Sequence, residues 1–392
     1  MWLYLIIFAM PLFAYIAGGQ ENRSKSFLVL YTAFLAFFVG MSDMLGGYDR
    51  YIYGNIFDNI ADNITNGIPI LSSDSFLYYE VGYSLLSTFI AFFTENRYIF
   101  ILILTLIIYY NLYKTFERHI NNYPLAFILF LGMMFFFTFT YLRQVIAFSF
   151  AWLSIKYLLE GNKIKFFCMV VLVALIHKSG IVFACLYFIP IKKWKPNQIR
   201  MILLGCAVIG LSGIVSGLYN IVMASGFIAG EGNDYNASGS ARIAYILEVF
   251  FFVWIILKNY EKIEKTRVNM IFLNMAWMFC GSLLLFVRSS DGGRVAWFFV
   301  IGIVYIITKI AITTQMKGVR FSRNYVGVLM VVVMLILYVR VFNAWQDYNN
   351  LYPYKTFLSN GRRIPDYSYE RYEYDYNYEV NKFYRPAFRF MK

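Results

Sequence analysis

The chain is poor in charged residues, histidine, cysteine and proline. Only 15% of its 392 residues are charged, and it holds two histidines, four cysteines and eight prolines. With 60% hydrophobic residues and a mean hydropathy of +0.57, this composition excludes an ordinary soluble domain. The cysteines lack the spacing of a zinc site or a disulfide framework, so we predict no metal and no cofactor. We interpret them as small core residues within apolar runs: Cys168, Cys185, Cys206 and Cys280.

Long apolar runs make up most of the sequence. Each is long enough to cross a bilayer, and together they predict an all-α, polytopic integral membrane protein. We expect the first run, which opens MWLYLIIF, to be a retained span and not a cleaved signal. The net charge of +13 fits basic cytoplasmic loops better than a nucleic-acid partner. The expected spans lie near 2–17, 27–42, 98–113, 125–141, 144–159, 201–222, 242–257, 270–287, 295–312 and 325–342.

Two further apolar segments decide the topology. Lysines flank both ends of 166–191, which predicts that the segment leaves the cytoplasm and returns, turning at His177 to Gly180. Each arm is short, so the turn is expected to line a polar cavity below the membrane surface. Segment 76–93 is expected to lie along, or dip into, the outer surface. This path gives about twelve crossings, with both termini outside.

The domain organisation follows from this path. Residues 1–342 are predicted to form a single transmembrane domain with outer loops at 43–97 and 223–241, and 343–392 a tyrosine-rich outer, periplasmic tail. Disorder and docking of the tail remain alternatives, because disordered segments are poor in aromatic residues. His119 falls in a basic inner loop, where we expect it to be solvated.

A small set of ionisable residues lies at the ends of apolar runs. An arginine at the centre of a membrane helix costs about 2.5–3.5 kcal/mol on insertion scales, so ionisable groups near the hydrocarbon indicate function. The predicted path places the whole set on the outer side. Its members are Asp49, Glu80, Arg143, His177, Arg242, Arg288 and Arg294.

The arginines in this set suit an anion beside lipid. Arginine binds phosphate oxygens through two parallel hydrogen bonds, and Lys178 adds a further cation next to His177. We predict that the pyrophosphate of a lipid-linked substrate is bound by Arg143, Arg288, Arg294, Arg242 and Lys178. For Arg242 a snorkelling membrane anchor is the simpler alternative, and for Arg143 a snorkelling residue at a hairpin turn.

Three residues are candidates for activating a hydroxyl group. Asp49, Glu80 and His177 can each orient or deprotonate an acceptor, and the sequence does not choose among them. Interface packing for Asp49, a solvated helix face for Glu80 and a satisfied packing residue for His177 are the alternatives. Arginines facing a leaving diphosphate would stabilise its developing charge. Together these groups describe glycan transfer from a polyprenyl carrier to a hydroxyl acceptor.

The chain resembles the EpsG family of Wzy-type exopolysaccharide and O-antigen polymerases over roughly its first half. In the second half the resemblance is limited to the span pattern and the late arginines. The matching motifs are G-x-D-x-x-x-Y at Gly47, Asp49 and Tyr53, E-x-G-Y at Glu80, Gly82 and Tyr83, R-Q-x-x-A at Arg143, Gln144 and Ala147, and H-x-S-G at His177, Ser179 and Gly180.

This resemblance implies a polymerase of undecaprenyl-pyrophosphate-linked repeat units. The enzyme would act on the outer, periplasmic face of the bacterial inner membrane, with a GT-C-like multi-span architecture and inverting, metal-independent transfer. Gln144, Tyr53 and Tyr83 would orient the glycan. Expected partners are the lipid-linked oligosaccharide, membrane lipids and a chain-length regulator, with no nucleic acid.

Other functions remain open at this point. An O-antigen ligase or a polyprenyl-phosphate-sugar glycosyltransferase would keep the chemistry and change the acceptor or the donor. A lipid-linked oligosaccharide flippase or transporter should place charges along a cavity that reaches both faces, often within repeated halves. The charges here gather on one predicted face, which favours the polymerase.

Overall fold

A computed structural model describes most of the chain. The described residues are 1–18, 22–215, 217, 241–289, 292–314, 325–346, 350–363 and 376–391. They form helices and connecting segments, with one isolated bridge between Ser42 and Thr356 and no named strand among them. Most of the predicted loop 223–241 and residue 291 lie outside this described part.

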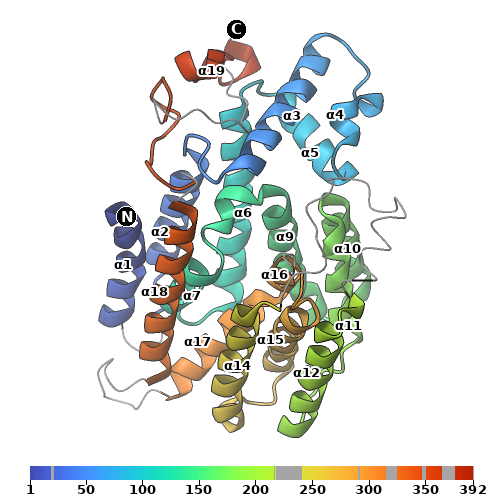
Figure 1. Cartoon of the computed structure of the whole chain (residues 1–392), viewed down its shortest axis with the longest axis vertical. Helices are drawn as coiled ribbons and strands as arrows, with labels where there is room; N and C mark the ends of the chain where they lie inside the picture. The colour runs from blue at the N-terminus through green and yellow to red at the C-terminus, as the bar shows by residue number, and fades with distance from the viewer. Residues whose placement is uncertain are drawn as a thin grey trace.

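The helices follow one another along the whole described chain (Figure 1). They are α1 (Trp2–Ala17), α2 (Lys25–Gly40), α3 (Tyr48–Thr65), η1 (Ile70–Ser72), α4 (Asp74–Leu77), α5 (Val81–Ala91), α6 (Arg97–His119), α7 (Tyr123–Met133), α8 (Phe137–Thr140), α9 (Leu142–Leu159), α10 (Lys163–Ile176), η2 (Lys178–Ala184), α11 (Cys185–Phe188), α12 (Pro196–Leu211), α14 (Ile243–Lys258), η3 (Tyr260–Lys262), α15 (Arg267–Leu285), α16 (Gly292–Ala296), η4 (Trp297–Phe299), α17 (Val300–Thr314), α18 (Tyr325–Gln346), α19 (Tyr376–Val380) and η6 (Arg389–Met391).

The helix lengths agree with a polytopic membrane protein. Five segments of the described chain are long and apolar enough to span a bilayer, and further apolar helices are shorter. Helix α5 has 11 residues, which is too short for a full crossing. The number of about twelve crossings stays a prediction. The five long segments are Arg97–His119, Leu142–Leu159, Arg267–Leu285, Gly293–Ile312 and Tyr325–Trp345.

Polar residues mark where several of these helices begin. The side chains of Ser24, Asn96, Asn122 and Thr266 each accept a hydrogen bond from a backbone N–H in the first turn. Such caps satisfy N–H groups that have no partner inside the helix, and they end the preceding loop at a defined residue.

Aromatic side chains join the first helix, α1, to the long helix α18. The Tyr4 ring of α1 lies 4.9 Å from that of Phe342 in α18, and Phe136 lies 4.6 Å from Tyr338. The Tyr338 hydroxyl donates to the Tyr4 carbonyl oxygen at 2.9 Å. Burial of four large rings and a satisfied hydroxyl holds α1, α18 and the segment between α7 and α8 together.

Helices α3, α4 and α5 form a layer across one end of the bundle, at the top of Figure 1. Arg50 ties this layer down, since its fully buried guanidinium donates to the carbonyl oxygens of Val39, Leu45 and Phe139 at 2.9–3.3 Å. Phe139 lies in α8, directly before α9. Arg50 therefore fixes α3 against the segment that leads to Arg143.

The segment 166–191 turns back on itself at the predicted place. Helix α10 ends at Ile176, His177 is its C-cap, and η2 and α11 return beside it. Phe166 at the start of α10 lies 6.2 Å from Tyr187, ring centre to ring centre. The prediction of a turn at His177 to Gly180 is confirmed.

The described part of the tail is docked. Lys382 donates to Asp43 Oδ1 at 2.9 Å, Arg385 forms a two-pronged pair with Asp62 at 2.8 and 2.9 Å, and Arg389 pairs with Glu95 at 2.5 Å. The Asn96 amide donates to the carbonyl oxygens of residues 382 and 385. These contacts place residues 376–391 on α3 and on the start of α6.

Two expectations about single residues are wrong. Cys168 and Cys185 are exposed and not core residues, because the apolar runs that contain them present much of their surface outward; Cys206 is half-buried and Cys280 buried. His119 is buried and not solvated, since the last turn of α6 packs its ring 5.2 Å from that of Phe272.

Candidate functional site

The site is built around an ion pair between Glu80 and Arg143. Arg143 Nη1 donates to Glu80 Oε2 at 2.6 Å, and the two side chains are 16% and 10% exposed. Glu80 is the residue before α5, and Arg143 is the second residue of α9. Two helix starts that lie 63 positions apart in sequence therefore meet through one charge-assisted hydrogen bond.

Glu80 makes a second contact, with the turn after α10. Its Oε1 accepts from the backbone N–H of Lys178 at 3.1 Å. Gly82 allows this approach, because a Cβ there would lie 2.8 Å from the backbone of Leu175. Burial raises the pKa of the Glu80 carboxyl, but the Arg143 guanidinium and the Lys178 N–H together hold that pKa below its usual value. Glu80 is therefore an ionised carboxylate at neutral pH.

His177 lies beside this pair at the end of α10. Its Nδ1 accepts from the Ser179 backbone N–H at 3.3 Å and lies 2.8 Å from the Ser179 hydroxyl oxygen. Burial and the nearby charge of Arg143 lower the pKa of the imidazole to about 3. The ring is therefore neutral, and an acceptor at Nδ1 places its proton on Nε2. His177 thus offers a neutral N–H donor to a ligand.

The Arg143 guanidinium lies against the ring of Tyr79, and two further tyrosines pack on Tyr79. The Arg143 guanidinium carbon lies 4.2 Å from the centre of the Tyr79 ring, and Tyr79 lies 5.5 Å from Tyr53 and 5.4 Å from Tyr83. Tyr53 and Tyr83 are buried, so they hold Tyr79 in place. The sequence reasoning missed Tyr79, although its position directly before Glu80 was a signal for it.

Gln144 connects this group to Arg294, which lies in α16. Its Nε2 donates to the Arg294 carbonyl oxygen at 2.7 Å, which fixes α16 beside the start of α9. The Arg294 guanidinium carbon lies 4.5 Å from the centre of the Tyr141 ring. Arg143 and Arg294 therefore project from two segments joined through Gln144, and each has a tyrosine face beneath it.

A cavity of about 510 Å³ extends from Arg294; most of its wall is apolar, but three charged side chains also line it, and we call it the polar cavity for that reason. Arg242, Tyr245 and Glu248 line it from one face of α14, at helical spacing of three residues. The Tyr245 hydroxyl accepts from the Gly293 N–H at 3.1 Å and thereby holds α14 against α16. The volume is within the range of small-molecule sites.

Glu248 is a residue that the sequence reasoning missed. It lies inside the apolar helix IAYILEVFFFVWIILK and lines the same cavity as Arg242 and Arg294. A carboxylate within such a helix is costly, and that cost was the available signal. Glu248 therefore provides a polar group on the wall of a cavity that two arginines also line.

The remaining predicted residues lie at two other places. Asp49 is in the first turn of α3, four residues before Tyr53, so both lie on the same side of that helix. Arg288 follows α15 and lies beside the end of α12, where a Cβ on Gly213 would be 3.6 Å from its Nη1. The structure thus brings together Glu80, Arg143, Gln144, His177 and Lys178, and it joins Arg294 and Arg242 through the polar cavity.

This arrangement combines cations, carboxylates and a neutral histidine around the start of α9 and the cavity beside Arg294. The cations can bind an anion of several charges, and the carboxylates can accept protons or hydroxyl groups. Tyrosine faces suit both guanidinium groups and sugar rings. The chemistry that these groups fit is transfer of a group from an anionic leaving group to a hydroxyl.

Comparison with known proteins gives one match. The family model for the EpsG family matches residues 25–356, which is more than half of the chain. Nothing among curated proteins or solved structures matches the chain.

Proposed function

This chain belongs to the EpsG family of polysaccharide polymerase-like membrane proteins, and we propose that it joins lipid-linked glycan repeat units into a polymer. The observation that carries the proposal is the Glu80–Arg143 pair, held at 2.6 Å beside Lys178 and next to the cavity lined by Arg242 and Arg294. It sets a carboxylate next to a cluster of cations. The substrate would be a polyprenyl-pyrophosphate carrier, with undecaprenyl as its lipid, in the bacterial inner membrane and on its outer face.

The reaction would exchange one bond at the anomeric carbon of the donor glycan. The acceptor hydroxyl oxygen bonds to this carbon while the bond from the carbon to the pyrophosphate oxygen breaks. The hydroxyl proton passes to a carboxylate, and the electron pair of the broken bond leaves with the polyprenyl pyrophosphate. Displacement from the face opposite the leaving group gives inversion. No metal is required where arginines neutralise the leaving charge.

Arg143 and Arg294 would bind the two phosphoryl groups, with Arg242 and Lys178 adding charge. When phosphate oxygens bind the Arg143 guanidinium, they replace Glu80 as its partner. The Glu80 carboxyl then loses part of its ion pair, and its pKa rises toward the usual range. It then accepts the proton of the acceptor hydroxyl. His177, with its proton on Nε2, would donate to the glycan or to the departing pyrophosphate.

The decisive experiment uses the full-length protein in nanodiscs with a polyprenyl-pyrophosphate-linked repeat unit. Arg143→Ala should lower polymer formation by about 10²–10³-fold, the usual effect of losing one donor to a developing charge. Arg143→Lys should restore little, because an ammonium lacks the planar fork. Arg200→Ala is the matched control, since Arg200 contacts Asn197 on an exposed face of α12.

Normal polymer from Arg143→Ala would contradict the proposal. A flippase would leave the repeat unit chemically unchanged in this assay, and a ligase would transfer it once without forming a ladder of products. The product pattern of the unaltered protein therefore separates these functions from polymerisation.

A further inference from the structure

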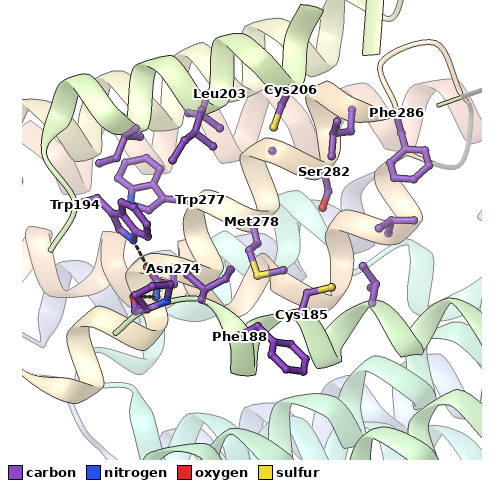
Figure 2. A pocket seen from close by; sticks show the side chains of 18 residues that line it. Cys185, Phe188, Trp194, Leu203, Cys206, Asn274, Trp277, Met278, Ser282 and Phe286 are labelled. Atoms are coloured by element: carbon purple, nitrogen blue, oxygen red, sulfur yellow. Dashed lines mark hydrogen bonds between the residues drawn. The ribbon is translucent and has the colours of Figure 1, made fainter. Parts of the chain in front are cut away.

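A second cavity, of about 510 Å³, lies between α11, α12 and α15 (Figure 2). Its wall is almost entirely apolar, with Leu203 and Cys206 contributed by α12 and Met278 by α15. Two polar groups lie at one end: Trp277 Nε1, which has no hydrogen-bond partner among the described residues, and the Asn274 amide, which is satisfied. Asn274 accepts from Trp194 Nε1 at 3.2 Å and donates to the Pro190 carbonyl oxygen at 3.1 Å. A cavity of this kind favours an apolar occupant over water.

The cavity opens toward the outside of the helix bundle. Phe188 and Ile202 line it and are 72% and 52% exposed. Exposed large apolar side chains on a membrane protein face lipid. An occupant can therefore enter sideways from the bilayer.

The other end of the cavity leads to the arginines. Phe286 and Val295 line it, and the segment between them carries Arg288 and Arg294. Arg288 lies beside Gly213, just after α12, and Arg294 lines the polar cavity of the proposed site. An apolar cavity that ends next to cations fits a molecule with an anionic head and an apolar chain.

Small side chains set the width of the cavity. Cys185, Cys206, Gly281 and Ser282 face it from all three helices. A Cβ added at Gly281 would have the Cys206 sulfur, 3.7 Å away, as its nearest contact. This leaves room for the methyl branches of an isoprenoid chain, which a wall of large side chains would exclude.

We propose that this cavity binds the head-proximal isoprenoid segment of the lipid-linked donor, an inference that rests on the proposed function. The chain of a donor whose pyrophosphate lies at Arg143 and Arg294 must leave the site through an apolar path. The cavity below Arg288 provides that path, and its volume holds a segment of the chain and not its whole length.

The test measures binding separately from polymerisation. The protein in nanodiscs is labelled with a long polyprenyl pyrophosphate that carries a photoreactive diazirine near its head. We expect the label on peptides that contain Cys206 or Met278. Gly281→Leu should lower labelling at least tenfold, because the added side chain enters the cavity. Gly205→Leu is the matched control, since no heavy atom lies within 4 Å of a Cβ there.

Two further measurements keep the test decisive. Cys206→Leu fills the cavity from the opposite helix and should also lower labelling, and a thermal unfolding curve shows whether each variant is folded. Inorganic pyrophosphate should compete equally in the control and in Gly281→Leu, because the head site is unchanged.

Equal labelling of the folded Gly281→Leu variant and the control would overturn the inference, as would full displacement of the probe by phosphatidylglycerol vesicles. If the probe labels the cavity but the unaltered protein forms no polymer, the proposed function fails while the lipid site stands. If the unaltered protein forms polymer but the probe does not label the cavity, the lipid site is wrong while the proposed function stands.

Discussion

At the scale of single residues, Glu80 has the contacts that decide the charge of the site. Its folded pKa is below the usual value, so the favourable pairing with Arg143 is complete above the unfolded pKa. It is lost as the pH falls through the lowered pKa of the folded protein. The pair therefore persists throughout the neutral range.

This predicts the pH dependence of Glu80→Gln. If Glu80 accepts the acceptor proton, the polymerisation rate of the unaltered protein should fall on the acid side as the carboxylate is protonated. Glu80→Gln should lower the rate by about 10²–10⁴-fold and should lack this acid limb. The measurement is a pH–rate profile for both proteins. An unchanged acid limb in Glu80→Gln would assign the titrating group to another residue.

Tyr79 allows a second test at this scale. Tyr79→Phe keeps the ring that lies 4.2 Å from the Arg143 guanidinium, whereas Tyr79→Leu removes it. A partly desolvated cation–π contact contributes about 1–2 kcal/mol, so Tyr79→Leu should weaken donor binding about five- to thirtyfold. Tyr79→Phe should bind almost normally. The apparent KM for the donor distinguishes them, and equal KM values would remove Tyr79 from the site.

Single residues also show what the sequence could and could not predict. Glu80, Arg143 and His177 stood out because ionisable groups beside apolar runs are costly. The partners of Glu80 were not predictable, since Arg143 and the Lys178 N–H lie 63 and 98 positions away in the sequence and meet it only through the packing of the helices. Glu248 was overlooked because it lies inside a run and not at its end.

At the scale of secondary-structure elements, the contact between α5 and α10 positions Glu80. A Cβ on Gly82 would come within 2.8 Å of the Leu175 carbonyl, which cannot move without shifting α10. The turn after α10 was predictable from the lysines around it. The close approach of α5 was not, because nothing in the sequence states which helix Gly82 contacts.

This contact predicts the effect of Gly82→Ala. The added methyl should push α5 from α10 and lengthen the contact between Glu80 and the Lys178 N–H, with at least a tenfold loss of polymerisation. Gly205→Ala is the matched control, because its Cβ meets open space and alanine favours a helix. Activity is measured together with thermal unfolding. Equal activity of the two variants would show that Gly82 does not position Glu80.

At the scale of the whole molecule, residues 376–391 of the tail dock on α3 and on the start of α6. Asp43 and Lys382 pair at 2.9 Å with side chains only 4% and 3% exposed, across 339 positions of sequence. The tyrosines of the tail made docking a fair alternative to disorder. The acidic residues with which the tail pairs were not predictable, because the sequence places acidic residues along the whole predicted outer surface.

Lys382→Met should therefore destabilise the protein strongly. Leaving one charge of a buried pair without its partner costs about 3–5 kcal/mol. Lys355 Nζ lies 3.8 Å from Asp43 Oδ2 and keeps part of the compensation, so we expect a loss at or below the lower end of this range. Lys114→Met is the control, since Lys114 and Glu117 form an exposed pair that is expected to contribute little to stability. Adding Asp43→Asn to Lys382→Met should restore part of the loss. Thermal unfolding in detergent measures all three, and similar shifts for both single variants would contradict the prediction.

The Glu80–Arg143 pair has a consequence for which anions can enter. Arg143 already has a carboxylate partner, so an incoming anion must displace it and gains nothing from an equal exchange. On the proposed function, we expect an orthophosphate ion to engage one guanidinium, whereas a diphosphate would also engage Arg294, which Gln144 holds beside the start of α9. The internal carboxylate would then act as a threshold that disfavours simple phosphates and favours ligands with two joined phosphoryl groups.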